Sequence, residues 1–555
     1  MGTEAYPGSA GDRSRLYREL WPPAILGLLA LALRMVHLEQ TPNLDELLHI
    51  LAARQYLVDG TLEVLGEPYV RARLFTFWVI GMMSLFGETL TVSRIPSVIS
   101  GTALVVALYL FVRWQAGRVA GAVAALLLAT WPTALYFSQT SRFYTLHSLA
   151  FFLGAVALFA FTLPDRTIRF RLVALLLSIP CLVLAWHLQP VTLLGLVPLG
   201  VWVTLSLGHE LSTRDHAGDR RILLVGGSLL VVGGVILLPL ILTSDWFAGM
   251  WSLFRFAPEW AEANRNELGF YHRRIFRDYP AFWSLFPVFL LVAAVARPRL
   301  SLFAAVVFFL ALILHSLAAW KQERYFFYAL PFFFLIIGVA AAEGIARFPG
   351  AVERLVHQLG FRSLSAPLVR TLQWGVALTI LAFFVLVMPT PRTILSVLLD
   401  RGSDTPSEIR SYYQYGLPAF SRAAGEMEQL LRTPGTVVLG VPATSTLFHL
   451  GRIDFTSEEL EFDGLTFEVS PSYHPGQSPP GLGVIRSPES MERMLACHPA
   501  GVALIERSRW RRSWGVPDSV ADVLEARTES IPFPQSWRMV GFRWTDGVDP
   551  NACQP

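Results

Sequence analysis

Long apolar segments separated by short polar ones make up most of the chain. Ile222–Leu242 and Leu300–Ala319 are examples that carry no Asp, Glu, Lys or Arg. A helix of about 20 apolar residues crosses the hydrocarbon core of a bilayer, and in lipid a helix satisfies its own backbone hydrogen bonds. The pattern therefore predicts about eleven transmembrane helices, near residues 21–38, 96–112, 119–137, 145–162, 171–186, 190–207, 222–242, 281–296, 300–319, 325–343 and 372–388.

Arginine residues predict which ends of these helices face the cytoplasm, because positively charged short loops stay on that side. Arg13, Arg15 and Arg18 precede the first apolar segment, and alternate short loops hold further arginines. We therefore expect residues 1–20 to lie in the cytoplasm and residues 21–389 to form a transmembrane domain. The first apolar segment lacks a small-residue cleavage site, so we expect it to remain as a signal anchor.

Three segments that this orientation places outside are long enough to fold. Residues 39–95 contain two amphipathic stretches, Asp45–Leu57 and Leu74–Phe86, which are typical of helices lying in the membrane interface. Residues 243–280 combine tryptophans with arginines, which suit the headgroup level. Residues 390–555 read as a small extracytoplasmic α/β domain. Its expected strands are Gly435–Gly440 and Ala500–Ile505, and its expected helices are Glu408–Leu431 and Pro488–Cys497.

Composition and charge narrow the class of protein. Of the 555 residues, 53% are hydrophobic and 16% are charged, whereas a soluble domain carries about 25% charged residues. This excludes a cytosolic enzyme, a fibrous protein and a disordered chain. The net charge of +3 gives no indication of a nucleic-acid partner. Of the three cysteines, Cys181 falls in a predicted helix, and Cys497 and Cys553 could form one bridge outside the membrane or stay two thiols.

Two acids and an imidazole follow the first predicted membrane helix, in the sequence Asn43-Leu44-Asp45-Glu46-Leu47-Leu48-His49. If this segment is helical, Asp45 and His49 share a face. One interpretation is a catalytic acid at the membrane surface. The other is a helix N-terminus capped by Asn43 or Asp45, where the helix dipole favours acids. Spacing alone leaves both interpretations open.

Arginine, tyrosine and histidine side chains recur at the other outward turns. They are Arg71 and Arg73, Arg142 and Tyr144, His187, and Arg324 and Tyr325. Arginine binds phosphate through charge-assisted hydrogen bonds, and polar residues at this depth often mark a cavity. Four of these residues also have a structural interpretation: lipid-headgroup contact for Arg71 and Arg73, a satisfied core histidine for His187, and a snorkelling anchor for Arg324.

The order of these motifs resembles the GT-C glycosyltransferases. More narrowly, it is similar to the family 39 branch, whose relatives include protein O-mannosyltransferases and lipid A aminoarabinose transferases. The resemblance covers roughly residues 20–390 and is strongest over 40–165. It is carried by the Asp45-Glu46 loop, Gly66-Glu67-Pro68-Tyr69, Phe86-Gly87, Ser93-Arg94-Ile95-Pro96-Ser97, Ser138-Gln139-Thr140-Ser141-Arg142-Phe143-Tyr144 and Arg324-Tyr325.

The resemblance implies an enzyme of the bacterial inner membrane that takes a sugar from a polyprenyl phosphate and transfers it to a glycan, lipid or protein acceptor outside. Asp45 would be the general base in an inverting displacement, and Glu46 would orient it or help to place a divalent cation. The remaining roles would be donor-phosphate binding by Arg71, Arg73, Arg142, Arg324 and Tyr325, and lining of a substrate cavity by His49, His187 and Tyr144.

One segment departs from the family pattern. Many relatives have an acidic residue followed by Lys-Pro-Pro where this chain has Arg71-Ala72-Arg73-Leu74. The remaining metal-ligand candidates are Glu46, His49 and Glu67.

Two other functional classes stay open. A flippase for a lipid-linked sugar would be expected to show inverted repeats and mid-membrane ionisable residues, and no repeat stands out in the sequence. A non-catalytic protein of cell-envelope glycan assembly would leave the first-loop acids unexplained.

Overall fold

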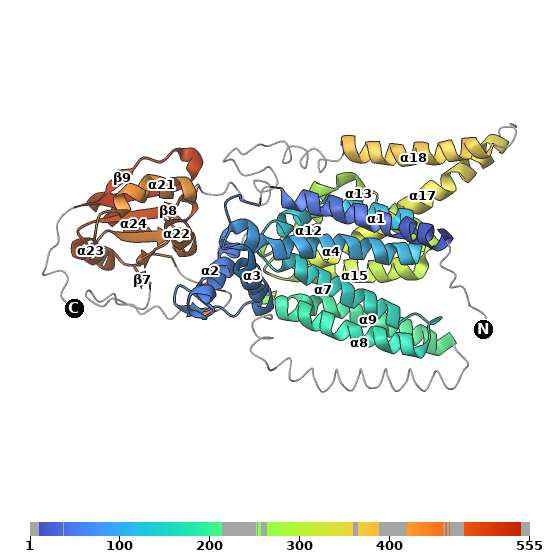
Figure 1. Cartoon of the computed structure of the whole chain (residues 1–555), viewed down its shortest axis with the longest axis horizontal. Coiled ribbons are helices and arrows are strands. Elements are labelled where there is room, and N and C mark those ends of the chain that lie inside the picture. The colour runs from blue at the N-terminus through green and yellow to red at the C-terminus, as the bar shows by residue number, and fades with distance from the viewer. Residues whose placement is uncertain are drawn as a thin grey trace, which may run out of the picture. The chain divides into compact units, whose positions relative to one another are not determined.

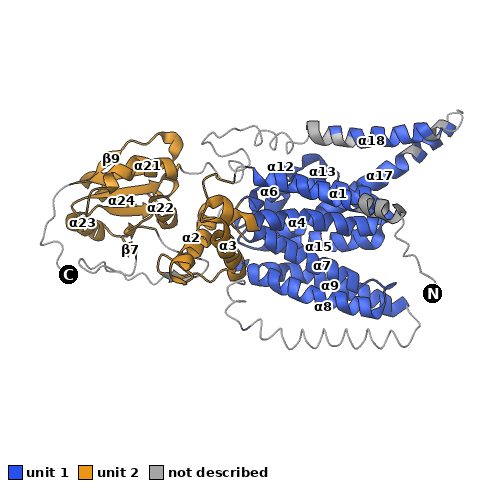
Figure 2. Cartoon of the chain, viewed as in Figure 1, with its two compact units in different colours: residues 1–36, 97–139, 143–401 blue, residues 37–96, 140–142, 402–555 orange. Residues whose placement is uncertain are grey.

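The computed structural model describes residues 10–36, 38–213, 264–358, 365–387, 419–458 and 482–545, with short pieces at 243, 251, 254–256, 461–462 and 465–466. The chain forms two compact units (Figure 2). The helical unit comprises residues 1–36, 97–139 and 143–401. The second unit joins residues 37–96 and 140–142 to residues 402–555, so it combines the segment that the sequence predicts as the first outward segment with the end of the chain.

Apolar helices that run side by side make up the helical unit (Figure 1). Its helices are α1 (Ala10–Met35), α4 (Leu90–Ala116), α5 (Arg118–Ala129), α6 (Pro132–Ser138), α7 (Tyr144–Phe161), α8 (Ile168–Leu188), α9 (Thr192–Thr213), α12 (Phe270–Asp278), α13 (Pro280–Ser284), α14 (Phe286–Ala296), α15 (Pro298–Leu317), α16 (Glu323–Phe326), α17 (Leu330–Gln358) and α18 (Ala366–Val387). The first residues of α4 belong to the second unit.

Within the described residues, six helices are long and apolar enough to cross a membrane, or seven if α5 and α6 count as one span. The expected helix over 119–137 is broken, because α5 and α6 meet at an angle of 64°. Pro132 begins α6 and Trp131 before it is extended, as the residue before a proline prefers. The expected helix over 281–296 is likewise divided, into α13 and α14. The segment 222–242 lies outside the described residues.

Close helix packing in this unit depends on small side chains. A Cβ atom placed on Gly338 of α17 would lie 2.5 Å from the carbonyl oxygen of Ala120 and 2.9 Å from the Cβ of Ala124, both on α5. The two backbones therefore approach closely, as in helix pairs with small residues at the interface. An alanine at this position would push α17 away from α5.

A six-stranded sheet forms the centre of the C-terminal part of the second unit, in the order β7-β4-β3-β8-β10-β9. Strands β7 (Gly483–Val484), β4 (Phe455–Thr456), β3 (Val437–Val441) and β8 (Gly501–Glu506) are parallel, and β10 (Met539–Trp544) is antiparallel to both of its neighbours, β8 and β9 (Glu529–Ile531). The helices are α21 (Phe420–Leu431), α22 (Ala443–Leu450), α23 (Pro488–Cys497) and α24 (Asp518–Arg527). The two expected strands are thus β3 and β8, and α23 has the expected bounds.

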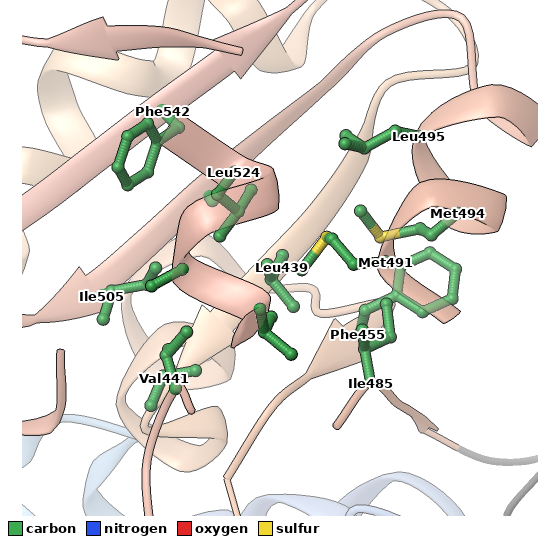
Figure 3. Close-up of a cluster of buried hydrophobic side chains, with 14 of the residues drawn as sticks. Leu439, Val441, Phe455, Ile485, Met491, Met494, Leu495, Ile505, Leu524 and Phe542 are labelled. Carbon is green, nitrogen blue, oxygen red and sulfur yellow. The ribbon is translucent and has the colours of Figure 1, made fainter. Parts of the chain in front are cut away.

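Both faces of this sheet are covered, so its central strands are apolar throughout. Leu439, Val441 and Ile505 pack with α23 and α24 on one face (Figure 3). Val438 and Leu504 pack with α21 on the other. The alternation follows the two-residue period of a strand.

The first outward segment contributes two helices to the same unit, α2 (Leu44–Asp59) and α3 (Arg73–Phe86), where the sequence predicted helical stretches. A short hairpin of β1 (Glu63–Val64) and β2 (Glu67–Pro68) connects them. The remaining short pair is β5 (Glu461–Phe462) with β6 (Leu465–Thr466).

Candidate functional site

Helix α2 begins with a capping box that uses one of the two predicted acids. The backbone N–H of Glu46 donates to Oδ1 of Asn43 at 2.9 Å, and the backbone N–H of Asn43 donates to Oε1 of Glu46 at 2.8 Å. This arrangement satisfies two backbone donors at the helix start. The N-terminus interpretation is therefore confirmed, with Asn43 as the cap residue and Glu46 as its partner in the capping box.

Glu46 also forms a buried ion pair with Arg94, and neither side chain is exposed to solvent. Arg94 donates to both carboxylate oxygens of Glu46, at 2.7 Å and 2.9 Å. The backbone N–H of Ser141 donates to Oε2 at 2.9 Å, and Arg94 also donates to the carbonyls of Leu38 and Gln40. Each carboxylate oxygen of Glu46 thus accepts two of these hydrogen bonds, which favours a positioning role over metal binding.

Asp45, the other acid of this segment, is partly buried. The fully buried Arg142 donates from Nη1 to the backbone carbonyl of Asp45 at 2.8 Å. Arg71 is half-buried in the turn before α3, and Arg73 is exposed at the first position of α3. The structure therefore brings Asp45 and Arg142 together, whereas Arg73 is directed to solvent.

His49 is a buried histidine whose two ring nitrogens both have partners. Nδ1 lies 2.8 Å from Oγ1 of Thr76, and Nε2 lies 3.2 Å from the hydroxyl of Tyr69. Burial, and then the positive charges of Arg142 and Arg71, lower the pKa of His49 well below its ordinary value, while Asp45 acts in the opposite direction. Two arginines and one carboxylate therefore act electrostatically on a neutral imidazole.

These residues do not fit a metal ion. In the part of the chain that the structure describes, no three histidine, cysteine, aspartate or glutamate side chains are grouped to hold one. Glu46 is engaged by Arg94, and His49 by Thr76 and Tyr69. The side chain of Glu67 and the whole of Cys553 lie outside the described residues.

The helical unit brings together three further predicted residues. Arg324 donates from Nη1 to the hydroxyl of Tyr144 at 3.2 Å. Its guanidinium also lies over the rings of Tyr144 and Tyr325, at 5.9 Å and 5.4 Å from their centroids. Arg324 is thus held between two aromatic rings by cation–π contacts. His187 is instead exposed in the last turn of α8, so it is not a core histidine.

A cavity beside α12 is lined by arginines for which the sequence predicted only a place at the level of the lipid headgroups. It has a volume of about 220 Å³ and is lined by Asn264, Glu267, Phe270, Arg273, Arg274 and Arg277. Arg274 pairs with Glu323 at 3.1 Å, and Arg277 pairs with Asp278 at 3.0 Å. The spacing of Arg273 and Arg277, which puts them on one helix face, was the signal that could have identified this cavity.

Replacing Arg94 by methionine is expected to destabilise the protein by about 3–5 kcal/mol, because the charge of Glu46 would stay buried without its partner. The double variant Glu46→Gln with Arg94→Met should lose less, since the neutral amide needs no counter-charge. The measurement is the fraction of folded protein on detergent chromatography after heating. The exposed Arg73→Met is the matched control and should behave as wild type. Equal losses in the Arg94 and Arg73 variants would contradict the assigned role of the pair.

Acid sensitivity provides a test of His49. The pKa of the folded imidazole is lowered, so the unfolded state binds more protons as the pH falls below the ordinary value of about 6.5. Stability is therefore complete above that pH and decreases below it. His49→Gln should lose less thermal stability than wild type between pH 7 and 5, in melting curves recorded across this range. The exposed His187→Gln should follow wild type, and an identical slope in the His49 variant would count against a neutral buried imidazole.

No protein-family model and no curated protein sequence matches the chain. Solved structures do match it over nearly its whole length. ArnT from Cupriavidus metallidurans bound to undecaprenyl phosphate is 14% identical, with a TM-score of 0.60 over 99% of this chain and 100% of that one. The apo state of ArnT is 16% identical, with a TM-score of 0.58 over 96% and 98%.

A third similar structure is AglB from Archaeoglobus fulgidus, an archaeal oligosaccharyltransferase in complex with an inhibitory peptide and a dolichol-phosphate. It is 12% identical, with a TM-score of 0.53 over 93% of this chain and 73% of that one. ArnT and AglB are GT-C fold glycosyltransferases. At these identities the likeness establishes the fold, so the resemblance expected from the motif order is confirmed: the chain is a membrane protein with the GT-C fold.

Proposed function

We propose that the chain is a membrane glycosyltransferase that moves a sugar from a polyprenyl phosphate to an acceptor hydroxyl on the outer face of the membrane. The observation that carries this proposal is the surroundings of Asp45. A partly buried carboxylate stands at the start of α2, and the guanidinium of Arg142 contacts its backbone. The GT-C fold supports the proposal, since ArnT has been solved with undecaprenyl phosphate bound.

In this proposal Asp45 acts as general base in an inverting displacement. The carboxylate takes the proton of the acceptor hydroxyl while that oxygen attacks the anomeric carbon. The bond between the anomeric carbon and the phosphate oxygen breaks, and polyprenyl phosphate leaves with the bonding electrons. One base on the acceptor suffices for this chemistry. Glu46 is held by Arg94 and the helix cap, and the partial burial of Asp45 supports the choice of Asp45 for this role.

The departing phosphate gains negative charge, which positioned cationic groups stabilise. In the second unit Arg71 and Arg142 supply such charge, as their effect on His49 indicates. In the helical unit we assign donor-phosphate binding to Arg324, with Tyr325 against its guanidinium, and to the three arginines of the α12 cavity. Arginine suits this role because its planar fork matches phosphate oxygens. The distribution of arginines supports a site on the outer face of the membrane, with the N-terminus in the cytoplasm.

Asp45→Asn is expected to lower the rate of sugar transfer by about 10²–10⁴-fold, the usual contribution of a general base, while folding is unchanged. The measurement is labelled sugar leaving a panel of polyprenyl-phosphate sugars in membranes. Asp59→Asn removes the exposed acid at the other end of α2 and should keep wild-type transfer. Equal transfer by the Asp45 variant would show that another residue acts as the general base. Binding of the lipid without transfer by wild type, with the acceptor supplied, would favour a flippase or a non-catalytic assembly protein.

Arg277→Gln is expected to raise the KM for the lipid-phosphate sugar by about tenfold or more, since a hydrogen bond to a charged group contributes about 1.5–3 kcal/mol. The turnover number should change less. Initial rates at increasing donor concentration measure both quantities. Arg347→Gln, which alters an exposed arginine of α17, is the control. An unchanged KM in the Arg277 variant would show that the α12 cavity does not bind the donor phosphate.

A further inference from the structure

Helix α22 of the C-terminal part packs directly on α2, the helix that carries Asp45. Leu447 and Phe448 of α22 contact a buried cluster formed by Leu47, Leu48, Leu51, Ala52, Val64 and Tyr69. Leu47 and Leu48 follow Glu46 immediately in the chain. The C-terminal residues thus complete the packing around the first two turns of α2.

A cation–π contact accompanies this apolar packing. The guanidinium of Arg54, on α2, lies 4.7 Å from the ring centroid of Phe448. Arg54 is partly buried, and a desolvated cation over an aromatic face is attracted more strongly than an exposed one. The ring of Phe448 lies beneath this guanidinium, so the contact adds to the apolar packing of α22 on α2.

The other end of α22 is fixed to the sheet. The backbone N–H of Ala443 donates to Glu458 at 2.7 Å, and Glu458 pairs with Arg509 at 2.7 Å. At the end that contacts α2, α22 is also held by α21: the ring of His449 stacks on Phe420, with centroids 5.8 Å apart and an interplanar angle of 8°. Since α22 is anchored in the α/β fold at its start and contacts α2 near its end, it transmits the position of that fold to α2.

We propose that α22 is a positioning element for the catalytic helix: Leu447 and Phe448 hold α2 in the place that aligns Asp45 with the acceptor hydroxyl. This inference rests on the proposed function of Asp45. Phe448 acts through α2 and is a positioning residue. A misplacement of about 1 Å at a reacting group can cost about 10²-fold in rate, so loss of this contact lowers turnover without removing any reacting group.

The test compares Phe448→Ala with the conservative Phe448→Tyr, which keeps a ring beneath Arg54, in the full-length protein. One readout is hydrogen exchange of the α2 amides, followed by mass spectrometry. The other is the kinetics of sugar transfer from a polyprenyl-phosphate sugar. Phe448→Ala is expected to speed exchange in α2 and to lower kcat at least about tenfold with little change in the donor KM. Phe448→Tyr should restore both.

Val523→Ala is the control, because Val523 packs against the cluster on the α23–α24 face of the sheet, in which no residue of α22 is named. It should leave α2 exchange and kcat at wild-type values. If Phe448→Ala does not fold, Arg54→Gln tests the same contact from α2. Unchanged exchange in α2 would overturn the positioning role, and so would equal losses in the Phe448 and Val523 variants. Absence of transfer by wild type would instead contradict the proposed function, and the exchange readout would still decide the positioning role.

Discussion

The buried ion pair between Glu46 and Arg94 is the interaction on which the arrangement of the first outward segment depends. It joins residues 48 positions apart in the chain, and both side chains are fully buried. A single buried charge without its partner is strongly destabilising, so α2 and the start of α4 have to meet at this point. The further hydrogen bonds of Arg94 to the carbonyls of Leu38 and Gln40 add the end of the preceding segment to the same junction.

This junction explains how two neighbouring acids come to differ in role. Consecutive residues of a helix point about 100° apart, so when Glu46 turns inward to Arg94, Asp45 is directed away from it. Arg142 follows Ser141, whose backbone also binds Glu46, and its guanidinium reaches the carbonyl of Asp45. Local geometry thus places a partly buried carboxylate, with a guanidinium at its backbone carbonyl, next to a fully buried one.

The second unit also shows how residues 37–96 pack against the last part of the chain. Residues of the first outward segment and of the last part of the chain share one apolar cluster around α2. An amphipathic helix at a membrane surface has one face that must be covered by lipid or protein. Here Leu447 and Phe448 cover part of that face, which connects the proposed catalytic helix to a well-packed α/β fold.

Local pattern in the sequence determined the apolar helices, α2 and α3 in the first outward segment, strands β3 and β8, and the bounds of α23, because hydrophobic period and capping residues act within a few turns of the chain. The order of short motifs was enough to predict the GT-C fold. Pro132 is a local signal for the bend between α5 and α6, but the apolar run continues through it and by its length predicts a single helix. The partner of Glu46, the core position of His49, the arginine cavity of α12 and the docking of α22 on α2 were decided only by tertiary structure. Each depends on which distant segments exclude water together, since a buried charge or imidazole takes its role from the groups that surround it in space.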